Sequence, residues 1–312
     1  MLTGIDIGGT KCAVLTGDGE NIIERISFPT TNVTDTLSAI YAAVEKVGCG
    51  DAIGVSCGSP LDSERGVILS PPNLPGWDNI DIVRELTQRF SVPAGLENDA
   101  NACALAEWRF GAGRGSKNMI FLTFGTGMGA GLILDGRLYR GTSGMAGEIG
   151  HVRMERFGPC GYGKAGSFEG FCSGGGIRQI GQTVAREKLQ TGQTVGFCQS
   201  SDDLDRITAK SIAEAAAGGD ADAIRVYEIC GEKLGQGLSV LIDVLNPEKI
   251  VIGSIYERSG ALLKTSMEAA IEREALAASR SVCRIVPAEL GDSVGDFAAI
   301  VVAADALERS QK

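Results

Sequence analysis

The sequence predicts an α/β protein with two domains of related topology. Its 312 residues are more than a single hydrophobic core usually holds, so two domains are expected. A strand, a glycine turn, a second strand and an Asp-Gly hairpin occur twice, near the start of the chain and again after residue 117. The offset is constant, because Gly125 minus Gly8 and Asp135 minus Asp18 both give 117. This internal repeat indicates that each copy begins one domain.

The first half of the chain continues in the order strand, strand, strand, helix, strand. A hairpin through Asp18-Gly19 joins the second and third strands, and a helical pattern covers residues 34–48. A buried strand follows over 52–60. The segment 95–113 then predicts a short strand that leads into an amphipathic helix. Together these elements describe one α/β domain.

The second half is mostly helical after residue 169. Apolar periodicity predicts helices over 174–190, 208–219 and 222–246, a buried strand over 249–254, a helix near 258–275, a strand over 283–289 and a final helix over 294–308. No linker rich in Pro, Gly or Ser separates these elements. We therefore expect a smaller domain of residues 1–115 plus 293–312, onto which the last helix folds back. The larger domain is expected over residues 116–292.

The composition limits the partners of this protein. A net charge of −10 argues against nucleic-acid binding, which needs an excess of Lys and Arg. No run of 18 apolar residues is long enough for a membrane span, and the chain begins directly on a strand without a leader, so a cytoplasmic location is expected. The nine cysteines are an odd number and are scattered along the chain, unlike a secreted disulfide framework. A phosphorylated ligand must then be held by backbone N–H groups and metal ions.

Both glycine turns have features of a phosphate site. In "DIGGTK" at 6–11, Gly8 and Gly9 leave backbone N–H groups uncovered, and Asp6 is suited to hold Mg²⁺ through water. The second turn, "FGTGMGAG" at 124–131, has four glycines. A strand and not a helix follows each turn, so neither a P-loop nor a dinucleotide fingerprint is present. The alternatives are plain hairpin turns, or two nests that clamp the phosphates of one nucleotide.

Polar residues follow a short strand in "GLENDANA". Asp99 fits either a helix N-cap or a general base that accepts a proton from a substrate hydroxyl, with Asn98 holding a neighbouring hydroxyl. The proline-fixed loop "SPPNLPGWDN" at 70–79 is either a simple turn or a rigid support that presents Asn73 to a polar ligand. The residues alone leave both alternatives open.

The motifs, taken in order, resemble one family. They are "DIGGTK", "GSPLD", "PPNLPGW", "ENDANA", "GTGMGAG", "GEIGH" and "SGGGI", and they cover nearly the whole chain. Each is weak alone, but the seven in register resemble the ROK family (repressor, ORF, kinase) of bacterial sugar kinases. The resemblance implies the two-domain, actin-like ATPase fold of the sugar kinase, Hsp70 and actin class, in which ATP·Mg²⁺ and a hexose meet in a cleft.

The resemblance also implies roles for single residues. Asp99 is expected to deprotonate the sugar hydroxyl, and the other hydroxyls are expected to bind Asn73, Asn98, Glu148, His151 and Glu169. The phosphates of ATP are expected to lie among Gly8, Gly9, Thr10, Lys11, Thr126 and Gly127, with Asp6 near Mg²⁺. Gly253 belongs to the adenosine-side motif. That motif matches only partly, because Ser254 stands where the family usually has another glycine.

The only histidine lies in a degenerate zinc motif. In the family, the histidine of "GEIGH" and three cysteines of a C-x-C-G-x-x-G-C-x-E pattern bind a structural Zn²⁺. Here Gly158 and Ser167 stand in place of two of the cysteines, while His151 and Cys160 stay in register. A closed tetrahedral site needs four ligands. We therefore expect no zinc and a loop held by hydrogen bonds; the alternative is a weakly held metal on His151, Cys160 and Cys172.

The leading function is an ATP-dependent phosphotransferase of the hexokinase or glucokinase type. Its expected acceptor is the C6 hydroxyl of glucose, an N-acetylhexosamine or a related sugar, and a homodimer is expected. A second hypothesis, motivated by the degenerate zinc motif, is a catalytically silent, sugar-responsive regulatory protein; the intact "DIGGTK" and "ENDANA" motifs weigh against it. The repressor branch carries a helix-turn-helix before the first strand, for which this chain has no residues, so the kinase branch is favoured. A third, an iron–sulfur ATPase activator motivated by the nine cysteines, leaves Asn73 and Glu148 unexplained.

Overall fold

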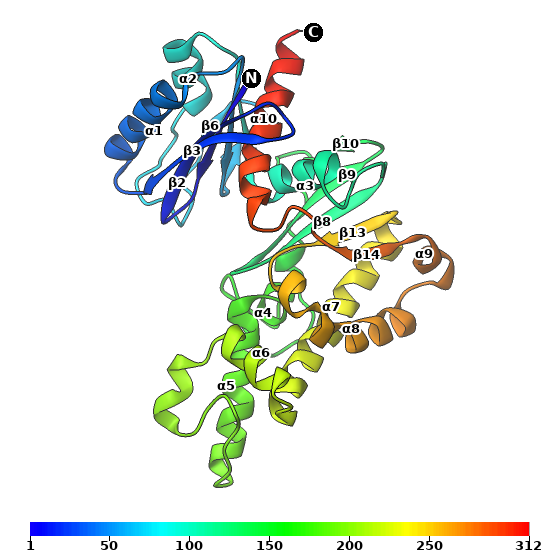
Figure 1. Ribbon diagram of the computed structural model, residues 1–312. Helices are drawn as coiled ribbons and strands as arrows, with labels where there is room; N and C mark the ends of the chain where they lie inside the picture. The colour runs from blue at the N-terminus through cyan, green and yellow to red at the C-terminus, as the bar shows by residue number, and fades with distance from the viewer. Residues whose placement is uncertain (312) are drawn as a thin grey trace. The chain divides into compact units, whose positions relative to one another are not determined.

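The computed structural model describes residues 1–311, which form two compact units (Figure 1). Unit 1 comprises Met1–Gly115, Gly131–Ala146 and the chain from Glu289 onward. Unit 2 comprises Ser116–Ala130 and Gly147–Ala288. The fold is α/β, as the sequence predicts, with one five-stranded sheet begun by each copy of the repeat.

The elements of unit 1 follow the predicted order. They are β1 (Leu2–Ile7), β2 (Lys11–Gly17), β3 (Ile22–Pro29), α1 (Val33–Val47), β4 (Ile53–Cys57), β5 (Leu61–Asp62), β6 (Val67–Ile68), α2 (Ile82–Phe90), β7 (Ala94–Asn98), α3 (Asp99–Phe110), β10 (Arg137–Leu138), the 3₁₀ helix η3 (Gly291–Ser293) and α10 (Val294–Ser310). The sheet has the order β3-β2-β1-β4-β7, in which β1, β4 and β7 are parallel. Strand β9 (Met128–Leu134) begins in unit 2 and enters unit 1 at Gly131.

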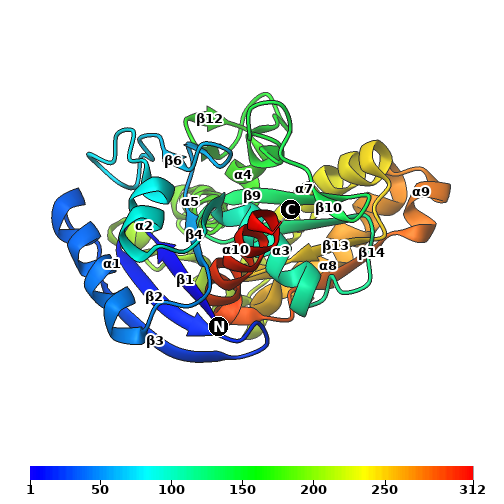
Figure 2. The same ribbon diagram turned by 90° about the horizontal axis from the view of Figure 1, so that it is seen from above.

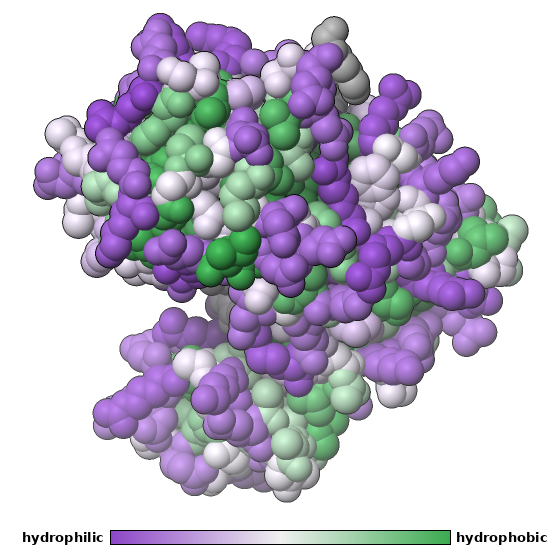
Figure 3. Space-filling model, turned by 45° about the horizontal axis from the view of Figure 1, so that its top comes forward, coloured by the Kyte–Doolittle hydropathy of each residue, from purple (hydrophilic) through white to green (hydrophobic). Residues whose placement is uncertain are grey.

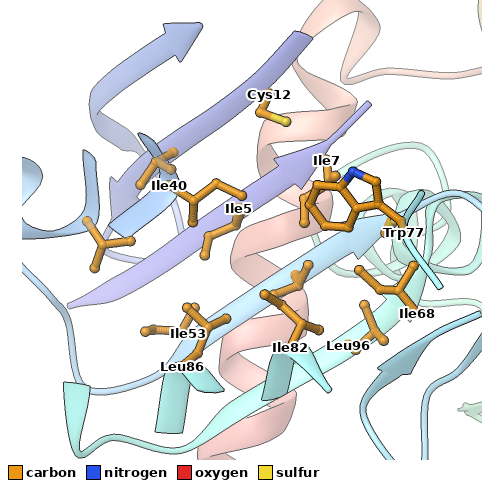
Figure 4. Packing of buried hydrophobic residues seen from close by; sticks show 14 of the residues in the cluster. Ile5, Ile7, Cys12, Ile40, Ile53, Ile68, Trp77, Ile82, Leu86 and Leu96 are labelled. Atoms are coloured by element: carbon orange, nitrogen blue, oxygen red, sulfur yellow. The ribbon is translucent and has the colours of Figure 1, made fainter. Parts of the chain in front are cut away.

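Helices cover both faces of the unit 1 sheet. Helices α1 and α2 bury one face, where, among the alternate residues of β1, Ile5 lies near Ile40 of α1 and Ile7 lies near Trp77 (Figure 4). The fully buried Trp77 belongs to the same cluster. On the other face α10 packs against β1 and β4 and runs beside α3, as Figure 2 shows from above. The last helix therefore returns to the first domain, as expected.

The elements of unit 2 repeat this plan with more helix. They are β8 (Met119–Phe124), η1 (Ile149–His151), β11 (Cys160–Gly161), β12 (Lys164–Ala165), α4 (Phe168–Phe171), α5 (Gly174–Gln190), η2 (Ser201–Arg206), α6 (Ala209–Ala217), α7 (Ala221–Leu245), β13 (Lys249–Ile252), α8 (Ile255–Glu274), α9 (Ala277–Val282) and β14 (Arg284–Pro287). The sheet order β10-β9-β8-β13-β14 is that of the first sheet. Adding 117 to the bounds of β1 and β2 gives those of β8 and β9, so the repeat read from the sequence is present in the fold.

The division into units differs from the expected boundaries in one main segment. Residues 131–146, expected in the larger domain, belong to unit 1. At Gly131 a Cβ atom would lie 2.4 Å from the Cβ of Ala104, so β9 and α3 are in direct contact there. The expected amphipathic character of α3 is wrong for the same reason. Residues 100–107 are all buried, since neighbouring elements cover the helix on several sides.

Hydrophilic residues cover much of the surface that Figure 3 shows, and hydrophobic residues form smaller groups between them. Within residues 1–311, no helix is long and apolar enough to cross a membrane.

Candidate functional site

In unit 1, the polar residues singled out by the sequence gather at one edge of the sheet. The last residues of the three parallel strands, Ile7, Cys57 and Asn98, are in register. The residues that follow them therefore lie at the same edge, which is where open α/β sheets bind ligands. This edge brings together the "DIGGTK" turn, Ser59 and Asp99.

Asn98, and not Asp99, is the N-cap of α3. Its Oδ1 accepts from the backbone N–H groups of Ala100 at 3.0 Å and Asn101 at 3.4 Å, and its Nδ2 donates to Ser59 Oγ at 2.8 Å. Asp99 is the first residue of the helix, and solvent reaches it. The protein atoms packed around its carboxyl nevertheless raise its pKa, an effect that hydrogen bonds from Ala100 N–H and Asn98 oppose. Asp99 is therefore left available to a ligand.

Asp6 lies among negative charges at the end of β1. Burial raises its pKa to about 6, and the nearby carboxylates of Asp296 and Asp99 add to the shift. Arg25, which holds Asp296 through two bonds of 2.9 and 3.0 Å, and Lys11 act in the opposite direction. A cation near Asp6 would relieve this repulsion. Within residues 1–311, no group of three or more His, Cys, Asp or Glu side chains is arranged to hold a metal ion.

The first glycine turn contacts the loop that carries Asn73. Gly8 N–H donates to the carbonyl of Lys11 at 3.1 Å, which closes the turn. A Cβ on Gly9 would lie 2.6 Å from the carbonyl oxygen of Asn73, so only glycine permits this approach. Thr10, Lys11 and Asn73 are exposed. The turn and the proline-fixed loop therefore form one surface.

Unit 1 also contains an ion pair that sequence reasoning missed. Glu97 is only 2% exposed, and its Oε2 accepts from Arg140 at 2.7 Å while its Oε1 accepts from Asn101 Nδ2 at 3.0 Å. The pair joins the segment 131–146 to the strand that leads into Asp99. No local pattern around Arg140 signals this contact, because its partner lies 43 residues earlier.

In unit 2 the second glycine turn is closed by its own backbone and by α5. Gly125 N–H donates to the carbonyl of Gly127 at 3.1 Å, and Gly174 N–H at the start of α5 donates to the carbonyl of Gly125 at 2.8 Å. Glu169 Oε2 accepts from Met128 N–H at 3.0 Å. Glu169, expected to bind sugar, therefore also supports the turn.

A pocket of about 830 Å³ opens beside this turn. It is lined by Gly125, Thr126, Gly174, Gly175, Arg178, Thr208, Ala209, Lys210, Ala213, Glu214, Ala217, Tyr227, Ser254, Ile255, Arg258 and Ser259. At the start of α5 the N–H groups of Gly174 and Gly176 are already bonded to the carbonyl of Gly125 and to Ser173 Oγ, so the helix contributes mainly the positive end of its dipole, which suits an anion. The volume lies in the range of pockets that hold nucleotides and other small ligands.

His151 and Glu148 are both exposed at the 3₁₀ helix η1. The imidazole of His151 lies edge-on to the ring of Tyr162, with 6.2 Å between ring centroids. Lys164 Nζ donates to the backbone carbonyl of His151 at 2.7 Å. The side chains of Glu148 and His151 are thus presented at the surface of unit 2, on the element that precedes the altered zinc loop.

The residues of that loop do not fit a zinc site. Cys160 is exposed, and its backbone is held by Gln179, which accepts from Cys160 N–H at 2.8 Å and donates to its carbonyl at 2.9 Å. Cys172 is fully buried, and its thiol donates to the carbonyl of Cys230 at 3.5 Å. The alternative metal set of His151, Cys160 and Cys172 is therefore not brought together, because Cys172 faces the core. Ser167, as expected, takes part in the hydrogen bonds of the loop, and caps α4.

Comparisons with known proteins agree with this architecture. The chain matches the ROK family over residues 2–306. A glucokinase of Halalkalibacterium halodurans is 34% identical over 308 residues, covering 94% of this chain and 91% of that protein. The DNA-binding transcriptional dual regulator NagC of Escherichia coli is 32% identical over 252 residues, covering 80% of this chain and 60% of that protein.

Among solved structures, a ROK family glucokinase from Streptomyces griseus in complex with glucose and AMPPNP is similar. Its TM-score is 0.78 at 30% identity, and the match covers 97% of this chain and 99% of that one. The two sheets of equal strand order are those of the actin-like ATPase fold. With its motifs, its fold and the match over nearly its whole length, this chain belongs to the ROK family.

Proposed function

We propose that this protein is an ATP-dependent sugar kinase that transfers the γ-phosphoryl group of ATP to the C6 hydroxyl of a hexose. The observation that carries the proposal is Asp99, a solvent-accessible carboxylate with a raised pKa at the sheet edge that also holds the "DIGGTK" turn. Membership of a family that includes glucokinases supports it. Because the reaction consumes ATP, we expect it to take place in the cytoplasm.

Asp99 acts as the general base in this proposal. A carboxylate whose pKa is raised toward neutrality accepts a proton more readily than an ordinary one, provided that it is ionised at the working pH. Asn98 already uses its amide to cap α3 and to bind Ser59, so it fixes the backbone of Asp99 as well as offering its carbonyl oxygen to a hydroxyl. Asn73 lies exposed on the loop that contacts Gly9, available to bind another hydroxyl.

Asp6 holds the water shell of Mg²⁺ that accompanies ATP. When bound, this ion neutralises charge on the transferring phosphates. The carboxyl of Asp6 carries a raised pKa among like charges, which favours a cation beside it. Next to it, Gly9 and Thr10 contribute backbone N–H groups and Lys11 a positive side chain, while the N–H of Gly8 keeps the turn closed.

In unit 2 the nucleotide binds at the second turn and the adjoining pocket. Thr126 and Gly127 bind phosphate oxygens, together with the first turn of α5, and the pocket of about 830 Å³ takes the adenosine next to Gly253. Glu148, His151 and Glu169 bind sugar hydroxyls. None of these three roles requires a zinc ion.

A coupled assay of ADP release tests the proposal. The purified protein is given ATP·Mg²⁺ and, one at a time, glucose, mannose, fructose, N-acetylglucosamine, N-acetylmannosamine and allose. We expect turnover with glucose or an N-acetylhexosamine, and a loss of about 10²–10⁴-fold in kcat for Asp99→Asn with sugar binding retained. Near-full activity of Asp99→Asn would show that Asp99 is not the general base.

The alternative is a catalytically silent regulatory protein, which the similarity to NagC favours. A protein of this kind binds a sugar without releasing ADP. Calorimetric titration with the same sugars separates the two functions. If the protein binds ATP and a sugar of the panel but releases no ADP with any of them, the regulatory function is supported and the kinase function is contradicted.

A further inference from the structure

The junction of β13 and α8 holds a serine in a backbone conformation that favours glycine. Ser254 has φ 61° and ψ −107°, the values of the first central residue of a type II′ turn. The turn is closed by Tyr256 N–H, which donates to the carbonyl of Gly253 at 3.4 Å. Glycine dominates this position because it has no Cβ, so a serine here makes the folded state less favourable.

Neighbouring side chains hold Ser254 in place. Its backbone N–H donates to Glu257 Oε1 at 2.5 Å, and Arg258 Nη2 donates to its hydroxyl oxygen at 3.3 Å. The hydroxyl oxygen would lie 3.5 Å from a Cβ placed on Gly125, so it faces the second glycine turn. Ser254, Arg258 and Gly125 all line the pocket of about 830 Å³.

The direction of the hydrogen bond from Arg258 decides what the hydroxyl can bind. Arg258 is a donor only, and in the capping box of α8 the backbone N–H of Glu257 is a second donor, so the oxygen of Ser254 accepts from both and the hydroxyl proton remains available to donate. The matching ligand is an acceptor without protons of its own. A phosphate oxygen meets this condition, and the hydroxyl lies beside the turn at which phosphates are proposed to bind.

We propose that Ser254 donates a hydrogen bond to a phosphate oxygen of the nucleotide, and that Arg258 orients the hydroxyl for this purpose. The inference rests on the proposed function, because it assumes that the nucleotide binds in this pocket. It explains why a glycine position in a kinase of this family carries a strained serine. Within the protein the same hydroxyl takes part in the capping box at the start of α8, and the proposed phosphate contact is a second use of it.

The test compares Ser254→Gly with Ser254→Ala. Replacement by glycine removes both the strain and the hydroxyl, so we expect a Tm higher by a few degrees and an affinity for ATP and ADP lower by about tenfold. Replacement by alanine removes the hydroxyl and keeps the strain, so the affinity falls by a similar factor without a rise in Tm. The affinity for adenosine is expected to stay the same in both variants. Calorimetric titration gives the Kd values, and a thermal melt gives the Tm.

Ser91→Gly is the matched control. Ser91 also has a positive φ, of 57°, but it is the C-cap of α2 in unit 1. We expect it to raise the Tm with no change in the Kd for ATP. If Ser254→Gly raises the Tm and leaves the Kd for ATP and ADP unchanged, the inference is wrong while the kinase proposal stands. Wild-type protein that binds no ATP would overturn both, and equal weakening for adenosine would contradict a phosphate contact.

Discussion

The two glycine turns share one backbone plan and differ in the chemistry around it. The strands on each side of the first turn, β1 and β2, recur as β8 and β9 at an offset of 117 residues. The same offset carries Asp6 to Thr123. Asp6 lies near Asp296 and Asp99, whereas Thr123 uses its hydroxyl to accept from Gly129 N–H at 2.8 Å. The equivalent positions thus differ: the first turn has an acidic residue where the second has a neutral threonine, and the carboxylate near the second turn, Glu169, is bonded to the N–H of Met128.

The difference shows how a duplicated fold acquires two functions without changing its strands. The carboxylates at the first turn attract a cation and a proton, which suits them to the reacting end of the proposed substrates. The second turn offers N–H groups and the start of α5 without a nearby acid at the equivalent position, which suits it to hold phosphates. Four predictions test this comparison.

The largest expected effect separates the two equivalent positions. Asp6→Asn is expected to lower kcat by about 10²-fold or more, because the neutral amide no longer attracts the metal. Thr123→Val is expected to lower kcat by less than tenfold, since it removes only the two hydrogen bonds between the Thr123 hydroxyl and the backbone of Gly129. Steady-state kinetics at saturating ATP·Mg²⁺ measures both. Equal losses of kcat in the two variants would mean that Asp6 and Thr123 contribute equally to turnover.

The second prediction compares two glutamates, one in each unit, whose carboxylates accept hydrogen bonds from backbone N–H groups. Glu107 of unit 1 is fully buried and accepts from the N–H groups of Ala112, Glu289 and Leu290 at 2.8 to 3.2 Å. Glu169 of unit 2 accepts from Met128 N–H at 3.0 Å. Glu107→Ala is expected to lower the free energy of unfolding by about 3 kcal/mol or more, and Glu169→Ala by about 1 kcal/mol.

Urea unfolding measures both variants. The effect on KM is expected in the reverse order: the KM for sugar rises in Glu169→Ala, and it changes little in the Glu107→Ala molecules that remain folded. A Glu107→Ala protein as stable as the wild type would show that the buried carboxylate does not hold these loops.

The third prediction concerns pH and follows from the raised pKa of Asp6. The folded value of about 6 lies above the ordinary value of 3.8, so the folded state holds the proton more tightly than the unfolded state. The stability that this carboxyl contributes is therefore full below pH 4 and is lost as pH rises to about 6. Asp6→Asn cannot ionise. In the absence of Mg²⁺ and ATP, its stability relative to wild type is expected to increase by up to about 3 kcal/mol over this range and to stay level above it.

Urea titrations at pH 4.5, 6 and 7.5 follow this difference, with Thr123→Val as the control without a charge. A difference between Asp6→Asn and wild type that does not change with pH would mean that Asp6 ionises at its ordinary pKa.

The smallest effect is expected in the loop between His151 and Ser167, which has no counterpart after the first turn. Gln179→Ala removes two hydrogen bonds to the backbone of Cys160, so we expect a loss of about 1 kcal/mol of stability and a higher KM for sugar. EDTA is expected to leave the Tm of the wild type unchanged. A stoichiometric zinc signal in metal analysis, or a fall in Tm with EDTA, would contradict a loop held by hydrogen bonds.

The sequence by itself determined the elements and their repetition. Strand alternation, glycine turns, the Asp-Gly hairpins and helical periodicity are local signals, and the two sheets of equal order follow from repeating them at a fixed offset. The position of Asp99 after a strand also predicted a candidate site residue, a role that stays a prediction, and the cap of α3 is Asn98. These features depend on neighbours within a few residues, so a single chain reveals them.

Only the tertiary structure decided which distant side chains meet. Asp296 affects Asp6 from 290 residues away, Arg140 pairs with Glu97, and Cys172 lies in the core rather than beside His151. The burial of α3 on several sides and the transfer of residues 131–146 to unit 1 also depend on such contacts. Burial and charge at a site are set by whatever the fold packs around it, and no local pattern contains that information.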